Sequence, residues 1–165
     1  MANRTLSTNA TAGGRPGWLA GALRIFSLRR PEVSQRRGLF IAALGLRVAG
    51  AGLLVWIGII HWLLWHDGYK FIPTSGPFFL VDAIAAVLLA VLVLAWPRPL
   101  VGLVSAGFVA STIAALLISL QFGLFGFHES TSASYVGLSL VIEPVAVLIL
   151  LVWTVIAAAS VPRDL

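Results

Sequence analysis

The chain has 165 residues, of which 59% are hydrophobic and 10% charged, and its mean hydropathy is +1.00. Soluble domains have roughly 45–50% apolar and about 25% charged residues, so this composition excludes water as the main solvent and indicates an integral membrane protein. Cysteine is absent, which excludes disulfides and cysteine nucleophiles, and the net charge of +5 does not indicate nucleic acid, because seven of the eleven Lys and Arg residues precede the first long apolar run.

The chain begins with a basic extension, predicted over residues 1–38. Its first 16 residues are small and polar, which is typical of disorder. From Trp18 to Arg30, apolar side chains recur at helical spacing among arginines, which predicts an interfacial helix on anionic lipid, with a flexible basic tail as the alternative. A cleaved signal peptide is not expected, because Arg24 interrupts the apolar part.

Four apolar runs follow the extension. A bilayer core of about 30 Å requires roughly 20 apolar residues in a helix. The runs predict transmembrane helices and are joined by short links, so the expected fold is an all-α membrane four-helix bundle in which neighbours in sequence pack antiparallel. The expected bounds are 39–65, 77–96, 100–127 and 136–159, followed by a short tail over 160–165.

The positive charges predict the orientation of the bundle. The N-terminal arginines, Arg98 and Arg163 fall on one side of the membrane, and Lys70 alone on the other. Cytoplasmic loops carry the excess of Lys and Arg. We therefore expect a multi-pass protein of the plasma membrane with both termini in the cytoplasm. Aromatic residues near the ends of the spans are expected to act as interfacial anchors, namely Trp62, Trp65, Tyr69, Trp96 and Trp153.

Small residues predict the packing faces of two spans. Membrane helices approach closely where small residues recur every four positions. On the first span, a face of small residues includes the ionisable Arg47 and His61. The third span has two rows, Gly102, Ala106, Ala110 and Ala114, and Gly107, Ser111, Ala115, Ser119 and Gly123, which predicts packing against two neighbours.

Ionisable residues inside the spans need a partner, water or a neutral form. Arg47 lies near the basic end of its span, and its side chain is expected to extend to the headgroups. Each span also contributes one polar residue near its outer end, which predicts a cluster of His61, Asp82, Gln121 and Glu143. The outer loops add the secondary candidates His66, Asp67, His128 and Glu129.

Each member of this cluster also has a structural interpretation. Thr74 or Ser75 would cap the helix that carries Asp82, and the helix dipole would offset part of its charge. Glu143 precedes Pro144, which kinks the helix or begins it there. His61 and Gln121 would hydrogen-bond to neighbouring helices. Ligand, ion or proton binding and structural polar packing therefore both stay open.

The motifs for metal, haem and nucleotide chemistry are weak or absent. His61, His66 and His128 lie toward one surface, but five-residue spacing separates the first two by about 140° around a helix, which is poor for zinc or copper. Ligation of a haem by His61 and His128 from neighbouring helices is geometrically conceivable, but the sequence has no haem attachment motif. The sequence contains no P-loop, dinucleotide fingerprint, nucleophile elbow or zincin motif, so it does not indicate an enzyme.

Two segments and Glu143 suggest a resemblance. The segment 61–80 has the pattern His-Trp-x2-Trp-His-Asp-Gly-Tyr-x2-Ile-Pro-x2-Gly-Pro-Phe-Phe-Leu, and residues 123–129 read Gly-Leu-Phe-Gly-Phe-His-Glu. Over residues 40–159 the chain resembles a group of small four-span integral membrane proteins of actinobacteria, which implies architecture and source but no activity. A looser similarity to membrane proteins of the DoxX kind rests on size and helix count.

Two functions are expected from these observations. The first is a non-enzymatic accessory or interaction subunit, whose small-residue faces pack in a homo-oligomer or against a membrane-protein partner. The alternative is a metal-, haem- or proton-handling membrane protein that uses the outer polar cluster. No cofactor is strongly indicated, and the metal is unknown.

Overall fold

The computed structural model describes residues 37–126 and 128–159, which form four long helices and one short one. The long helices are α2 (Arg37–Asp67), α3 (Ser75–Ala95), α4 (Pro99–Gln121) and α5 (Val136–Ala159), and the 3-10 helix η1 (Tyr69–Phe71) lies between α2 and α3. Each long helix is apolar and long enough to cross a membrane. The predicted four-helix class is therefore confirmed, whereas the predicted disordered segment, interfacial helix and C-terminal tail lie outside the described residues.

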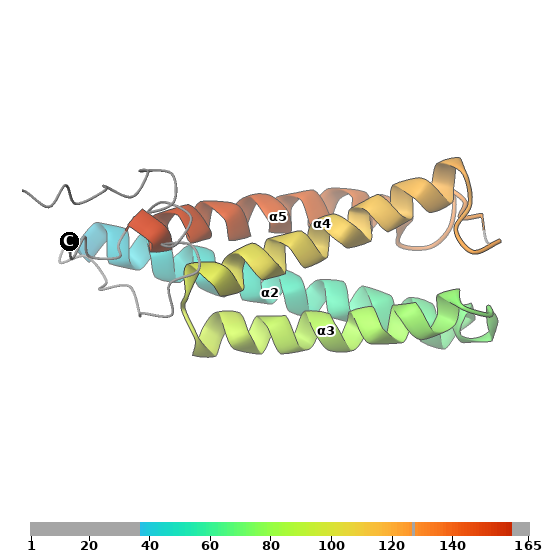
Figure 1. The fold of residues 1–165 in the computed structure, drawn as a ribbon, viewed down its shortest axis with the longest axis horizontal. Helices are drawn as coiled ribbons and strands as arrows, with labels where there is room; N and C mark the ends of the chain where they lie inside the picture. Colours follow the sequence, from blue (N-terminus) through green and yellow to red (C-terminus); the bar gives the residue numbers. More distant parts are fainter. Residues whose placement is uncertain (1–36, 127, 160–165) are drawn as a thin grey trace, which may run out of the picture.

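The helices form two pairs of sequence neighbours, which are joined mainly through α2 and α5. α2 lies along α3, α4 along α5, and α2 also packs on α5, whereas α3 and α4 contact each other far less. The start of α2, the end of α5 and the turn between α3 and α4 lie together, which we call the single-turn end (Figure 1). The α2–α3 and α4–α5 connections lie at the opposite, two-loop end. The outer surfaces of all four helices carry large apolar side chains, as expected for contact with lipid.

α4 and α5 approach closely near the single-turn end. Gly102 faces α5, and a Cβ atom there would lie 2.7 Å from the ring of Trp153 and also against Thr154. Trp153 is 2% exposed and belongs to the core, so the prediction that it anchors the bundle at the interface is wrong. A glycine opposite the ring provides the space that the indole needs.

The two small-residue rows predicted on α4 are only partly buried. Gly102 and Ala106 face the core, but Ala110 and Ala114 are exposed. Four-residue steps rotate by about 40° each around a helix of 3.6 residues per turn, so such a row drifts away from its neighbour. The face of α4 that is buried combines three- and four-residue steps, Gly102, Ser105, Ala106, Val109 and Thr112.

The predicted face of the first span is confirmed over most of its length. Gly50, Leu54, Gly58 and His61 are buried along α2. A Cβ atom on Gly58 would lie 3.1 Å from the backbone oxygen of Ala83, so the absence of a side chain lets α2 and α3 approach. The small residues and His61 therefore share the inner face of the helix.

Arg47 has a different role from the one predicted. Its guanidinium donates through Nε to the carbonyl of Val93, at 2.9 Å, and through a terminal nitrogen to the carbonyl of Leu94. Residue 97, four positions after Val93, is proline and has no N–H to donate to that carbonyl. Arg47 therefore caps the C-terminus of α3, where a cation also complements the helix dipole, instead of extending to the headgroups.

The predicted third span is too long at its C-terminal end. α4 ends at Gln121, and residues 122–126 form the start of a loop. Gly123 and Gly126 have φ of 80° and Phe125 has φ of 52°, which is the left-handed region where a right-handed helix cannot continue. The loop between α4 and α5 therefore covers residues 122–135 and includes aromatic residues that the sequence placed in a span.

Candidate functional site

A cavity of about 360 Å³ lies inside the bundle toward the two-loop end. Residues from all four long helices and from the 122–135 loop line it. Most of the surface area that these residues present to the cavity is apolar. This size is within the range of small-molecule sites, which have about 300–1,000 Å³ and apolar walls with a few polar groups. The polar and ionisable lining residues are His61, Ser75, Asp82, Ser111, Thr112, Ser119, Glu129, Ser139 and Glu143.

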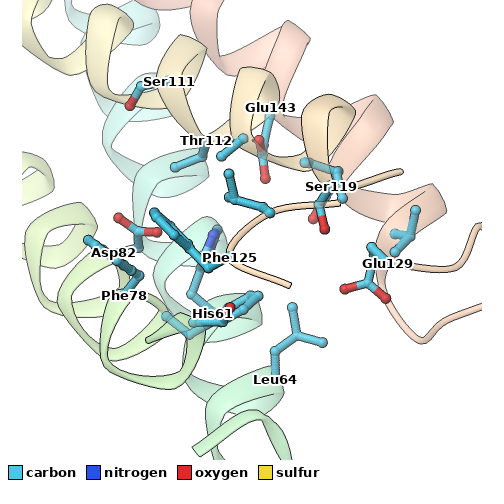
Figure 2. A pocket seen from close by; sticks show the side chains of 17 residues that line it. His61, Leu64, Phe78, Asp82, Ser111, Thr112, Ser119, Phe125, Glu129 and Glu143 are labelled. Carbon is cyan, nitrogen blue, oxygen red and sulfur yellow. Dashed lines mark hydrogen bonds between the residues drawn. The ribbon is translucent and has the colours of Figure 1, made fainter. Parts of the chain in front are cut away.

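Three members of the predicted cluster meet at this cavity. His61 comes from α2, Asp82 from α3 and Glu143 from α5, and Figure 2 shows their side chains around a common space. Gln121 does not line the cavity and is exposed, because α4 ends at this residue and does not extend beyond it.

The secondary candidates in the loops divide in the same way. Glu129 lines the cavity. His66 and Asp67 contact each other at 3.2 Å with side chains that are 63% and 60% exposed, and His128 is exposed. Only Glu129 among these four can therefore contribute directly to the cavity.

His61 is held with one ring nitrogen available. The residue is 7% exposed, and its Nδ1 lies 2.9 Å from the carbonyl oxygen of Ile57 one turn earlier. A carbonyl can only accept, so Nδ1 carries the proton in this contact and Nε2 is a hydrogen-bond acceptor when the ring is neutral. Within the described part of the chain, no hydrogen bond to Nε2 is found, and the ring packs against Phe79 with centroids 5.8 Å apart.

Glu143 is the most deeply buried carboxyl group of the cavity, with 2% exposure. Its Oε2 lies 2.9 Å from the hydroxyl of Thr112 on α4, and that hydroxyl also lies 2.8 Å from the carbonyl of Val109. A hydroxyl has one proton to donate. Thr112 therefore either donates to an ionised Glu143, or donates to Val109 while accepting a hydrogen bond from a neutral Glu143, so this pair accommodates both charge states.

Pro144 does not begin the helix, as one of the two predictions for it required. α5 starts at Val136 and includes Pro144 in its interior. The seven residues before Glu143 therefore form almost two helical turns, and they place Ser139 on the same face, one turn from the carboxyl group, where both side chains line the cavity.

The carboxyl group of Asp82, unlike that of Glu143, has no hydrogen-bonding partner in the described chain. Asp82 is half-buried on α3, and no hydrogen bond to its carboxyl group is found among residues 37–126 and 128–159. Thr74 is the N-cap of α3 but makes no side-chain capping hydrogen bond. The helix dipole acts most strongly in the first turn, and Asp82 lies beyond that turn. The predicted stabilisation by capping is therefore wrong. The carboxyl group interacts electrostatically with His61 and with Glu143, so the three side chains form one electrostatic unit.

Aromatic residues of the loop complete the cavity, and the sequence analysis missed their contribution. Phe125 stacks on Phe78 of α3, with ring centroids 5.5 Å apart and planes inclined by 9°. Both rings line the cavity, as does Phe79 (Figure 2). The signal available in the sequence was the pair of glycines at positions 123 and 126, which permit the left-handed turn that returns Phe125 to the bundle.

A hydrogen bond joins the two loops at the cavity. The hydroxyl of Tyr69 donates to Glu129 Oε2 at 2.8 Å, and Tyr69 also packs edge-on against Phe79 at 4.7 Å between centroids. Burial and the hydrogen bond to Glu129 both raise the pKa of the Tyr69 phenol above its usual range. The phenol is therefore neutral near pH 7 and remains a donor to the carboxylate.

The geometry does not favour a metal centre. Among the described residues, no group of three or more His, Cys, Asp or Glu side chains is close enough together to hold a metal ion. His128 does not face the cavity, so the two histidines considered for haem do not share a space.

Comparison with protein-family models, with curated proteins and with solved structures finds no match. The function is therefore argued from the cavity alone.

Proposed function

We propose that this protein is an integral membrane binding protein whose cavity holds a small amphipathic molecule. The observation that carries the proposal is the convergence of His61, Asp82 and Glu143, from three different helices, on a cavity whose remaining lining combines apolar and aromatic side chains with hydroxyl groups and Glu129. Such a site binds an apolar body by burial and orients a polar group by a few hydrogen bonds. We propose binding without a chemical step.

The cost of these polar groups supports a ligand-binding role. An ionisable side chain in the membrane interior destabilises the protein by roughly 2.5 kcal/mol or more on insertion scales, unless it is paired, hydrated or neutral. Polar packing between helices would explain Glu143, which has Thr112 as a partner. It does not explain Asp82, for which no hydrogen-bonding partner is found within the described chain.

Two substitutions on α4 provide a matched test of the cavity. Ala115 lines it, whereas Ala114 is exposed on the same turn of the helix. Ala115→Leu should fill part of the cavity and Ala114→Leu should leave it open. Equilibrium dialysis of 2-phenylethanol against protein in nanodiscs should show saturable binding for the wild type and for Ala114→Leu, and a loss of that binding for Ala115→Leu. Equal binding by all three proteins would refute the proposal.

The cavity is proposed to face the outside of the plasma membrane, with both termini in the cytoplasm and the N-terminal arginines on anionic lipid. The distribution of Lys and Arg supports this orientation. Because the chain has no cysteine, single cysteines at Ser132 in the 122–135 loop and at Ser160 report the two sides. A membrane-impermeant maleimide added to intact cells should label the first and not the second; the reverse labelling would overturn the orientation.

A role as an accessory or interaction subunit is a second candidate. It is favoured by the exposed small residues Gly107, Ala110 and Ala114 on α4, because a Cβ atom at Gly107 would meet nothing within 4 Å of it in the chain. Such a face allows another helix to approach closely. Gly107→Leu should reduce association of the detergent-purified protein measured by light scattering, and an unchanged mass would exclude this face as the contact.

A further inference from the structure

We propose that the occupant of the cavity is an organic ammonium ion, a protonated amine that carries an apolar or aromatic body. This inference rests on the proposed function and specifies the chemistry of its ligand. It follows from the sign of the charges around the cavity, from the hydrogen-bonding capacity of its polar atoms and from its aromatic walls.

Three of the four ionisable residues that line the cavity are acidic. Its ionisable lining residues are Asp82, Glu129, Glu143 and His61, and none of its lining residues is Lys or Arg. The nearest described cations have other partners: Lys70 lies 5.8 Å from the centre of the Trp65 ring, and Arg47 caps α3 at the single-turn end. Apart from His61, the described bundle therefore supplies no cation to these three carboxyl groups, and a cationic ligand complements them.

The ionisable lining side chains offer acceptor atoms that have no hydrogen-bonding partner in the described chain. His61 Nε2 accepts when the ring is neutral, because Nδ1 donates to Ile57, and the ionised carboxylate of Asp82 has only acceptor oxygens. An ammonium group offers up to three donors and a positive charge, so one group satisfies both residues. A quaternary ammonium ion would supply the charge but no N–H donor.

The walls of the cavity suit the rest of such a ligand. Phe78, Phe79 and Phe125 present aromatic surface next to the acidic groups. Aromatic faces attract cations through the ring quadrupole, by roughly 0.5–2 kcal/mol depending on solvation. The same rings bury the apolar body of an amine, so the walls contribute to both parts of the ligand.

The Glu143–Thr112 pair allows the ligand to exchange with a proton. When a cation enters, a neutral Glu143 can release its proton to water, and the Thr112 hydroxyl then turns from Val109 to donate to the carboxylate. Asp82 faces the same space from α3, His61 from α2 and Glu129 from the 122–135 loop, while α4 contributes only hydroxyl and apolar groups. Because entry of the cation releases the proton of Glu143, the affinity for the cation should fall as the pH is lowered.

The test compares 2-phenylethylammonium with 2-phenylethanol, two molecules of similar shape that differ in charge. Binding is measured by equilibrium dialysis against protein in nanodiscs of phosphatidylglycerol, which has no ammonium headgroup, with Ala115→Leu as the blank. The wild type should bind the ammonium at least tenfold more tightly than the alcohol. Asp82→Asn should remove that preference, so that the variant binds the two probes with similar affinity.

Asp67→Asn is the matched control, because Asp67 carries the same group on the exposed loop side and does not line the cavity. It should keep the full preference for the ammonium. Between about pH 8 and about pH 5 the probe stays protonated, so any loss of affinity belongs to the protein. His61→Gln should retain part of this pH dependence, since the carboxyl groups remain.

The outcomes separate the two proposals. Binding of the alcohol without a preference for the ammonium would overturn the ammonium inference and leave the proposed function standing. No saturable binding of either probe would overturn both. If phosphatidylethanolamine added to the nanodiscs displaces the bound ammonium, the ammonium group comes from a lipid headgroup; if it does not, the ligand is a free amine.

Discussion

The two ends of the α4 helix use small residues for opposite purposes. Near the single-turn end, Gly102 faces Trp153 of α5 so closely that a methyl group would collide with the ring. Toward the two-loop end, Ala115 and Ser119 line a cavity instead, where α3 and α4 are in limited contact. A small residue in a membrane helix thus indicates either a close approach or an open space, and the neighbouring helix decides which.

The polar side chains at the two ends of the bundle also differ in whether they have hydrogen-bonding partners. At the single-turn end, Arg47 is satisfied by the carbonyls of Val93 and Leu94; Pro97 has no N–H for the first, and the N–H of Arg98 donates to Trp96 instead of the second. At the two-loop end, Asp82 and the Nε2 atom of His61 lie at the cavity without a hydrogen-bonding partner in the described chain. The first arrangement is complete within the described chain, and the second leaves acceptor atoms for the ligand that we propose.

The largest expected effect is on stability at the close-packed end. Gly102→Ala forces a methyl group against Trp153 and Thr154 and should destabilise the bundle by roughly 1–3 kcal/mol, the usual range for overpacking. Gly107→Ala on the same helix meets nothing within 4 Å and should be neutral or slightly stabilising. Thermal unfolding in detergent compares the two variants, and similar midpoints would show that the predicted contact does not exist.

Removal of the Arg47 cap should have the next largest effect. Arg47→Met deletes charge-assisted hydrogen bonds to Val93 and Leu94 and should cost roughly 1–3 kcal/mol. Arg47→Lys keeps a cation near the helix terminus and should recover part of the loss. Denaturant titration in detergent measures both variants. An unchanged stability of Arg47→Met would contradict the capping role and favour the headgroup contact expected from the sequence.

Among the packing variants, a substitution that fills the cavity at the two-loop end should change the free energy of unfolding least. Ala115→Leu adds apolar volume where the cavity has room, so its effect on unfolding should stay within about 1 kcal/mol although it blocks ligand binding. Ala114→Leu on the exposed side serves as the control. A destabilisation of Ala115→Leu as large as that of Gly102→Ala would mean that the two-loop end is as closely packed as the other.

The smallest expected effect concerns the hydrogen bond between the loops. The pKa of Tyr69 is raised, so the neutral phenol stabilises the fold below its ordinary pKa of about 10, and this contribution is lost as the pH rises through the raised value. The chain has two tyrosines, and the difference between the ultraviolet titrations of the wild type and Tyr69→Phe isolates this residue. Ionisation of Tyr69 near pH 10 would contradict the burial and the contact with Glu129.

Apolar run length predicted the fold well, because a bilayer-spanning helix is a local property of the chain. The first, second and fourth spans agree with α2, α3 and α5 to within two residues at each end. The third span failed at its C-terminal end because apolarity does not distinguish a helix from a loop that packs back on the bundle. Residues 122–126 are apolar or glycine, and only their left-handed backbone reveals the turn.

The candidate site was predicted in its ionisable members and missed in its walls. His61, Asp82 and Glu143 could be placed at one depth because each lies a countable number of helical turns from the end of its span. Gln121 failed together with the helix end on which it depended. Thr112 and Phe125 were not found, since their contributions depend on which neighbouring helix each faces, and that is decided by packing between segments far apart in sequence.

One measurement tests the central claim, that the cavity between the helices is a ligand site, most directly. Single cysteines replace Ala115 and Ala114 in this chain, which has no cysteine of its own, and the rate of modification by a small membrane-permeant maleimide is followed with and without 2-phenylethylammonium. The ligand should slow modification at position 115 and leave position 114 unchanged. Equal rates at position 115 with and without the ligand, at saturating concentration, would contradict the claim.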